Sequence, residues 1–232
     1  DKIEEFLNGE IPAPITLEIQ PTEKCSCNCP HCQSRQFFAE DIRQEMVRHG
    51  AELDLELLDK ILQSPPDNVI ISGTTGEPLL YPYINELLLK LHNKNIPITL
   101  LTNGLNMDSE LAGNIVKCCT TVRISLDAAD EAAYAESHGV KAACWKKVTD
   151  HIVMLVNEKR LNRSKCGIGI GYLTDTESDE IEKAARLALD LGVDFIDFRP
   201  FQKDRVYPIN KALLKKISES RIFETKDFKI NS

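Results

Sequence analysis

The sequence predicts an α/β fold in which a parallel sheet is covered by outer helices. Six strand-like runs alternate with six helical runs along the 232 residues. Successive parallel strands need long crossover connections, which are usually helices, so this alternation indicates one βα unit after another. Six units fall two short of a complete eightfold barrel.

Each expected element follows from its residue pattern. The strands are expected at residues 15–22, 68–73, 98–103, 121–126, 167–173 and 194–200, and the helices at 54–63, 82–93, 109–117, 145–158, 177–191 and 210–220. Asp108 and Thr176 stand where helix caps are favoured, and Gly192 follows a predicted helix end. We therefore expect a lead-in at 1–14, a core domain at 15–202 and a C-terminal helix and tail at 203–232. The chain begins at Asp1 rather than Met, which is consistent with a trimmed sequence.

Several of these strands alternate polar and apolar residues, whereas a strand buried on both faces would be nearly continuously apolar. In the fourth strand, Arg123 and Ser125 lie opposite Val122 and Ile124. The apolar faces can pack against the helices, and the polar faces then converge inside the sheet. Because unpaired buried charge is costly, this predicts a wet, polar lumen with a polar ligand. An exposed sheet face is the alternative.

Composition excludes some classes of protein. The chain has 42% hydrophobic and 28% charged residues and a formal net charge of -8, as in an ordinary soluble domain. No run reaches the roughly 20 apolar residues of a membrane helix. The acidic balance argues against a nucleic-acid partner. Eight cysteines without an export signal favour a reducing, cytoplasmic compartment.

Three cysteines share one short loop after the first expected strand. Cys25, Cys29 and Cys32 have the spacing C-x3-C-x2-C, and Cys27 lies between them but off that spacing. Three thiolates suit three corners of a cubane iron–sulfur cluster, which usually has four cysteine ligands. Structural zinc commonly uses two cysteine pairs, and a second pair at suitable spacing is missing. The remaining cysteines suit small buried residues: Cys118, Cys119, Cys144 and Cys166.

In this loop the chain resembles the radical S-adenosylmethionine (radical SAM) superfamily. The resemblance implies an open partial (β/α)6 barrel and a [4Fe-4S] cluster on Cys25, Cys29 and Cys32. It also implies that the fourth iron chelates SAM. Cys27 is interpreted as a bystander.

A second motif follows the second expected strand, at Gly76-Glu77-Pro78. Glycine allows close backbone approach, and Glu77 offers an acceptor at the strand end, where barrel enzymes place their sites. The segment resembles the superfamily's Gly-Gly-Glu-Pro motif, which implies that Gly76 and Glu77 hold the SAM amino group. Thr75 replaces the first glycine of that motif and restricts φ.

The third and fourth strands also end in motifs similar to those of the superfamily. Thr102-Asn103-Gly104 implies that Asn103 faces SAM or substrate, although Asn-Gly is also a common turn. Ser125-Leu126-Asp127 implies contacts with the SAM ribose and carboxylate. Asp127 could serve the substrate instead.

Three further positions complete the candidate SAM site. The glycines of the fifth strand, among them Gly169 and Gly171, share one face and leave space for a flat group, which the resemblance identifies as adenine. His31 stands where relatives often have an aromatic residue beside adenine, or it is packed or solvent-facing. Arg199 could bind a carboxylate, or pair with Asp197 as structure.

The resemblance implies an enzyme whose reduced cluster cleaves SAM to a 5′-deoxyadenosyl radical that abstracts hydrogen from a substrate. It also implies an external electron donor such as flavodoxin or ferredoxin. We expect a small polar metabolite such as a sugar or nucleoside as substrate. The alternatives are a peptide- or protein-modifying enzyme (a maturase or activase) and, outside this superfamily, an iron–sulfur electron carrier or a zinc protein. No cysteine follows Cys166, so an auxiliary cluster domain is absent or trimmed away.

Overall fold

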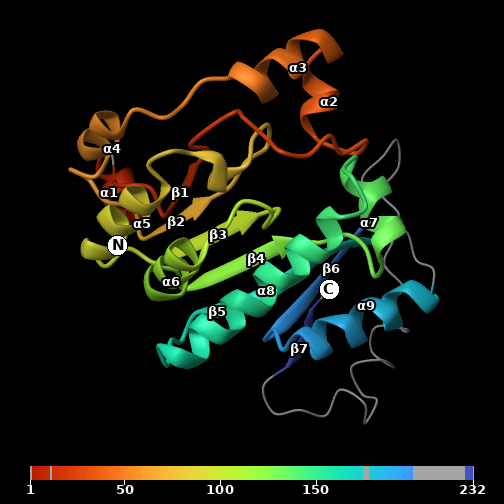
Figure 1. The fold of residues 1–232 in the computed structure, drawn as a ribbon. Helices are drawn as coiled ribbons and strands as arrows, with labels where there is room; N and C mark the ends of the chain where they lie inside the picture. Colours follow the sequence, from red (N-terminus) through yellow and green to blue (C-terminus); the bar gives the residue numbers. More distant parts are fainter. Residues whose placement is uncertain (1, 11, 175–177, 201–227, 232) are drawn as a thin grey trace.

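A seven-stranded parallel sheet forms the centre of the molecule (Figure 1). The computed structural model describes residues 2–10, 12–174, 178–200 and 228–231. The strands follow one another across the sheet in chain order. They are β1 (Thr16–Ile19), β2 (Asn68–Ile71), β3 (Ile98–Thr102), β4 (Thr121–Ser125), β5 (Gly167–Thr174), β6 (Phe195–Pro200) and β7 (Lys229–Asn231).

Among the described residues, one helix precedes β1 and the others lie between successive strands from β1 to β6, as the crossover rule requires. They are α1 (Lys2–Leu7), α2 (Ser34–Phe37), α3 (Glu40–His49), α4 (Leu55–Ile61), the short 3-10 helix η1 (Pro78–Leu80), α5 (Ile84–Asn93), α6 (Ser109–Cys118), α7 (Glu131–His138), α8 (Cys144–Leu161) and α9 (Ser178–Leu191). No helix in the described part of the chain is long and apolar enough to cross a membrane.

The predicted α/β fold with an open, partial-barrel sheet is confirmed. All six expected strands form, and β7 is an addition that pairs in parallel with β6. Its three residues are too few for a periodic pattern to reveal a strand. Short or weakly patterned helices were also not predicted: α1, α2, α3 and α7. The expected helix at 210–220 and the expected core boundary at 202 lie outside the described residues.

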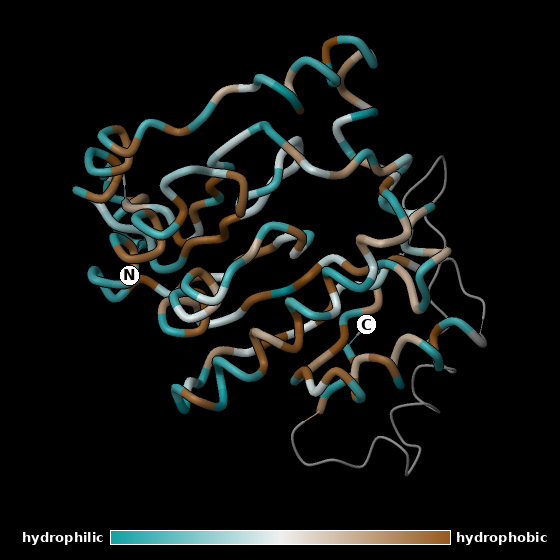
Figure 2. The backbone as a smooth tube through the Cα atoms, viewed as in Figure 1, coloured by the Kyte–Doolittle hydropathy of each residue, from teal (hydrophilic) through white to brown (hydrophobic). Residues whose placement is uncertain are grey.

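The apolar core lies between the sheet and its outer helices. Ile71, Leu100, Ile124 and Ile170 are at most 1% exposed and belong to the sheet face that packs against the helices. Helices α5, α6, α8 and α9 each bury an apolar stripe on this face. In Figure 2 these helices alternate brown and teal, as expected for helices with one face on a sheet.

The other sheet face is less completely covered. It carries the polar residues Glu18, Arg123 and Asp197 together with the apolar residues Ile70 and Leu101. In β2 and β3 every second residue is fully buried, and the residues between are only partly covered. Asp108 caps α6 by accepting a hydrogen bond from the Leu111 N–H at 2.9 Å, which confirms that predicted helix start. The polar face and the loops that follow the strands form the candidate active site.

Candidate active site

The cysteine loop follows β1 and lies at the rim of a large cavity. The cavity measures about 680 Å³. Cys25, Cys29 and Cys32 all line it, and each is a partly exposed, free cysteine. The cavity lies at the carboxyl ends of the strands, where barrel enzymes place their sites.

Most of the expected site residues meet in this one cavity. From the sequence-predicted set, its walls include Cys25, Cys29, His31, Cys32, Gly76, Glu77, Asn103, Ser125 and Asp127. Gly169, Gly171 and Arg199 do not line it. The motifs that follow β1 to β4 are therefore brought together, while the expected β5 and β6 positions lie outside the cavity.

Cys27 differs from its neighbours in being buried, with 6% of its surface exposed. Hydrogen bonds to Cys25 and Cys29, followed by burial, raise the pKa of the Cys27 thiol. The hydrogen bond from Cys27 lowers the pKa of Cys25, whose backbone partner is the Cys27 N–H at 3.5 Å.

The loop after β2 is tied directly to the cysteine loop. The Glu77 N–H donates to the Lys24 carbonyl at 2.7 Å, immediately before Cys25. A Cβ on Gly76 would lie 1.9 Å from the Thr22 carbonyl oxygen, so only glycine permits this approach. Thr75 is not among the described residues with positive φ, so a threonine is accommodated where the superfamily has glycine.

The Glu77 carboxylate is 3% exposed and bridges two loops. It accepts hydrogen bonds from the Asn103 N–H at 2.7 Å, the Leu79 N–H at 3.0 Å and the Thr102 hydroxyl. Burial raises the pKa of Glu77, and these three hydrogen bonds oppose that rise. In this structure the carboxylate holds the ends of β2 and β3 together.

Asn103 connects β3 to the cysteine loop. Its side-chain amide donates to Ser26 Oγ at 3.3 Å and to Cys27 Sγ at 3.4 Å, and it lies 3.9 Å from Cys25 Sγ. Its side-chain oxygen accepts from the Leu105 N–H at 2.9 Å. The side chain lines the cavity, but its hydrogen bonds go to the protein.

The end of β4 forms the opposite wall of the cavity. Asp127 has a φ of 48°, in the left-handed region that non-glycine residues rarely adopt. Its carboxylate accepts from the Leu173 N–H at 2.7 Å, and burial raises its pKa. The buried His138 ring lies 4.0 Å from this carboxylate and is 3.1 Å from the Ser125 carbonyl oxygen. The left-handed backbone of Asp127 is a form of strain that is common at functional sites.

The glycine face of β5 was predicted to leave space for adenine, and this interpretation is wrong for Gly169. A Cβ there would lie 2.1 Å from the Phe195 ring, so that ring already fills the space. A Cβ on Gly171 would lie 3.3 Å from Arg123 Nε. Both glycines therefore make room for side chains of neighbouring strands.

Arg123, rather than Arg199, forms the ion pair with Asp197. The distance from Arg123 Nη1 to Asp197 Oδ2 is 3.3 Å. Arg199, the residue before the last of β6, has an exposed side chain. His31 is also exposed, at the cavity rim.

Sequence reasoning did not single out several residues that line the cavity. Ser72 continues the period-two alternation of β2 onto the polar face, and Arg123 was placed on that face but given no role. Thr102 shares the buried face of β3 with Leu100, so alternation could not have placed it in the cavity. His138 ends a helix that was not predicted, and no local pattern signals its role.

The donor set fits the cluster that the cysteine spacing indicates. A cubane distributes its thiolates over different irons, so the three ligands need not converge on one point. Among the described residues, no three His, Cys, Asp or Glu side chains gather closely enough to hold a single metal ion. The partly exposed thiols at the rim of a polar cavity leave room for a small molecule beside a cluster.

Sequence comparison finds similar known proteins. PqqA peptide cyclase of Streptomyces rochei is 26% identical over 193 residues, covering 80% of this chain and 48% of that relative. The S-adenosyl-L-methionine-dependent tRNA 4-demethylwyosine synthase of Methanocaldococcus jannaschii is 30% identical over 136 residues, covering 59% and 40%. The chain spans about half or less of these curated relatives.

Solved structures agree on the fold. Streptococcus suis SuiB, crystallised with its precursor peptide SuiA, superposes with a TM-score of 0.68 at 17% identity, over 99% of this chain and 52% of that one. The family model for the radical SAM superfamily matches residues 19–196. The chain therefore belongs to the radical SAM superfamily, whose members are enzymes that use a [4Fe-4S] cluster and S-adenosylmethionine.

Proposed function

We propose that Cys25, Cys29 and Cys32 bind the cluster, that SAM occupies the adjoining cavity, and that the enzyme modifies a peptide. The observation that supports the site most strongly is that these three cysteines line the same cavity as the Gly76-Glu77 turn. A reduced cluster held there supplies the electron that cleaves SAM to methionine and a 5′-deoxyadenosyl radical.

The residues around the cavity then bind and orient SAM. The turn at Gly76 and Glu77 offers backbone and carboxylate oxygens for the amino group, and Asn103 fixes the neighbouring cysteine loop. Ser125 and Asp127 present a hydroxyl and a carboxylate from β4, which suit ribose hydroxyls. His31 at the rim is the proposed neighbour of the adenine.

Relatives favour a peptide substrate over the sugar or nucleoside that the sequence suggested. PqqA peptide cyclase matches along 80% of this chain. SuiB, which shares the fold, was crystallised with a precursor peptide. The cavity of about 680 Å³ lies within the roughly 300–1,000 Å³ typical of ligand pockets. Exposed residues such as Glu18 and His31 line its open side, where a longer chain could enter.

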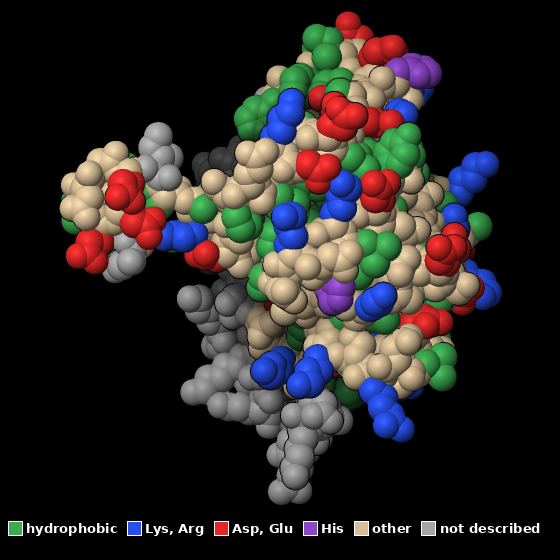
Figure 3. All heavy atoms as spheres, turned by 90° about the vertical axis from the view of Figure 1, so that its left-hand side faces the viewer, with side chains coloured by type: hydrophobic (Ala, Val, Ile, Leu, Met, Phe, Trp, Pro, Cys, Tyr) green, Lys and Arg blue, Asp and Glu red, His purple; other side chains and the backbone are tan. Residues whose placement is uncertain are grey.

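A tRNA substrate, as the name of the wyosine synthase states for that enzyme, is a weaker candidate. Binding to nucleic acid depends strongly on Lys and Arg contacts with phosphate. This chain carries a net charge of -8. On the face shown in Figure 3, acidic and basic side chains are interspersed. We therefore place nucleic acid outside the proposed partners and include an external electron donor such as flavodoxin or ferredoxin.

The first experiment is anaerobic reconstitution with iron and sulfide, followed by dithionite and SAM. We expect 5′-deoxyadenosine by mass spectrometry, and an EPR signal of the reduced cluster that changes when SAM is added. A four-iron cluster whose EPR signal ignores SAM would contradict the proposal and favour an electron carrier. Bound zinc without iron would favour a structural site.

A second measurement tests the substrate class. The reconstituted enzyme is given pools of synthetic peptides, of nucleosides and sugars, or of tRNA, each with the same SAM concentration. We expect peptides to raise 5′-deoxyadenosine formation above the rate with SAM alone. A rise only with nucleosides, sugars or tRNA would overturn the peptide assignment and leave the cluster assignment standing.

A further inference from the structure

A buried arginine lies directly behind the cysteine loop. Arg43 of α3 is 2% exposed, which is rare for a charged side chain without partners. Its guanidinium donates to Asn28 Oδ1 at 2.5 Å and to both carboxylate oxygens of Glu40, at 2.7 and 3.1 Å. Asn28 is the residue between Cys27 and Cys29.

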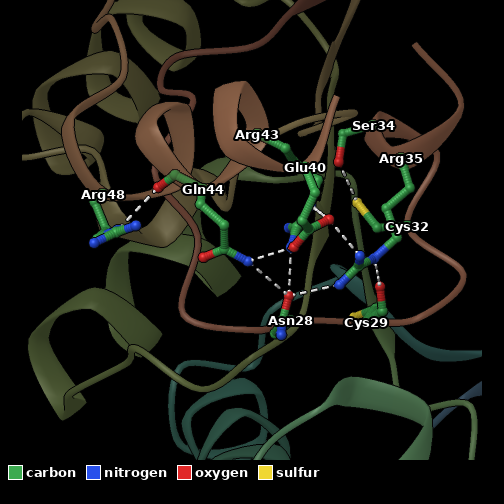
Figure 4. Close-up of polar contacts among 9 residues, drawn as sticks. All are labelled: Asn28, Cys29, Cys32, Ser34, Arg35, Glu40, Arg43, Gln44 and Arg48. Carbon is green, nitrogen blue, oxygen red and sulfur yellow. Dashed lines mark hydrogen bonds and ion pairs between the residues drawn. The ribbon is translucent and has the colours of Figure 1, made fainter. Parts of the chain in front are cut away.

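A second arginine reaches the same loop from α2. Arg35 donates to the Cys29 carbonyl at 2.9 Å, to Asn28 Oδ1 at 2.7 Å and to Glu40 at 2.5 Å. Figure 4 shows both guanidiniums converging on Asn28, with the Glu40 carboxylate between them. We call Asn28, Arg35, Glu40 and Arg43 the arginine clamp.

Asn28 also ties the clamp to the far wall of the cavity. Its backbone N–H donates to the His138 carbonyl at 2.9 Å. A Cβ on Gly139, which has a φ of 59°, would lie 2.3 Å from the Asn28 carbonyl oxygen. Only a glycine after α7 therefore allows the loop to pack so closely, and Asn28 is fixed through both its backbone and its side chain.

The clamp has a net positive charge. Hydrogen bonds from Arg43 and Gln44 hold the pKa of Glu40 at about 2, so its carboxylate stays ionised at neutral pH. Two guanidiniums and one carboxylate leave one excess positive charge beside the cysteines. The excess charge lies against the cysteine loop itself, because Arg35 donates to the Cys29 carbonyl at 2.9 Å and Arg43 donates to the side chain of Asn28, the residue before Cys29.

We propose that Arg35 and Arg43 are positioning residues that hold the cysteine loop and, through the net positive charge of the clamp, raise the reduction potential of the cluster. The inference rests on the proposed cluster ligands. Reduction adds negative charge to a cluster, and a nearby buried cation stabilises the reduced form. The groups around first ligands commonly tune a metal site in this way.

The test compares three full-length, reconstituted variants that differ in charge at matched places on α3. Arg43→Gln removes a clamp cation, and Glu40→Gln removes the clamp anion. Arg48→Gln is the control, because Arg48 is exposed and donates to the Gln44 carbonyl at 3.1 Å without touching Asn28. For each, iron per chain and the midpoint potential are measured, the latter by an EPR-monitored titration.

We expect opposite shifts. Arg43→Gln makes the potential more negative, Glu40→Gln makes it more positive, and Arg48→Gln leaves it unchanged. A purely structural clamp would lower iron loading in the first two variants without shifts of opposite sign. Shifts in the same direction, no shift, or an equal shift in Arg48→Gln would overturn the electrostatic role.

One further variant keeps the result interpretable. If Arg43→Gln fails to load iron, Arg43→Lys keeps the charge but loses the forked hydrogen bonds. It is expected to lose some iron loading while the loaded fraction keeps the native potential. The positive shift of the midpoint potential expected for Glu40→Gln tests the sign of the electrostatic effect without any change at Arg43. Failure of the native chain to bind iron through its cysteines would instead refute the proposed ligands.

Discussion

The polar face of the sheet differs between two groups of strands: β1 to β4, which we call the cavity side, and β5 and β6 on the other side. At the ends of β1 to β4, loops leave the sheet and surround the cavity. In β5 and β6, the corresponding face is filled by the protein itself, with the Phe195 ring over Gly169 and Arg123 beside Gly171. Bare glycines in a strand thus do not by themselves indicate a ligand.

Backbone hydrogen bonds hold the cavity side in a fixed arrangement, which suits the cofactor site proposed there. Lys24 accepts from the Glu77 N–H, and Asn28 donates to the His138 carbonyl. These bonds fix the cysteine loop from two directions, and Asn103 contacts it from a third. A site held by groups that are themselves fixed is preorganised for binding. Three substitutions would break or sharpen this contrast.

The largest effect is expected on the cavity side. Cys29→Ala should abolish cluster assembly and 5′-deoxyadenosine formation while the sheet stays folded, because Cys29 is partly exposed at the rim. Iron per chain and circular dichroism measure both. Cys144→Ala is the matched control, since Cys144 is also partly exposed but does not line the cavity. Native iron content in Cys29→Ala would refute its role as a ligand.

On the other side, Gly169→Val should affect stability rather than the cofactors. Its Cβ would lie 2.1 Å from the Phe195 ring, and overpacking costs about 1–3 kcal/mol or more. Urea unfolding of the apoprotein measures the loss. Gly171→Ala should change stability less, because its Cβ meets the flexible Arg123 side chain at 3.3 Å. Unchanged stability in Gly169→Val, with weaker SAM binding, would restore the adenine interpretation.

The smallest effect is on the pH dependence of stability. It arises from Glu77, which joins the two loops of the cavity side. Burial raises its folded pKa above the ordinary carboxyl value, so the native state binds its proton more tightly than the unfolded state. Its contribution to stability is therefore full below the ordinary value near 4.5 and is lost as pH rises through the raised pKa.

Glu77→Gln removes this titration. The stability of the native chain relative to the variant should grow as pH falls from the raised pKa towards 4.5, by about 1.4 kcal/mol per pH unit at most. Urea unfolding of both proteins across that range measures the difference, and titration of Asp127 is common to both. A difference that shrinks on acidification would contradict a raised pKa.

The sequence predicted the sheet because alternation within β1 to β6 and capping residues such as Asp108 are local signals. The cysteine loop and the Gly76-Glu77 turn were also visible as motifs. Neither the Phe195 ring over Gly169 nor the Asn28–His138 bond could be predicted, since each joins positions far apart in the chain. Arg43 was missed because nothing in the sequence of α3 distinguishes this buried arginine from Arg48, which is exposed on the same helix.

The Asn28–His138 hydrogen bond also has a consequence for the order of folding. It joins the loop after β1 to the end of α7, so most of the first four strands must be in place before it can form. Contacts between such distant positions form late in folding, because closing a long loop of chain costs conformational entropy. The cysteine loop should therefore be among the last parts to reach its native shape. If the cysteines are the proposed cluster ligands, insertion of iron after folding is the expected order of maturation.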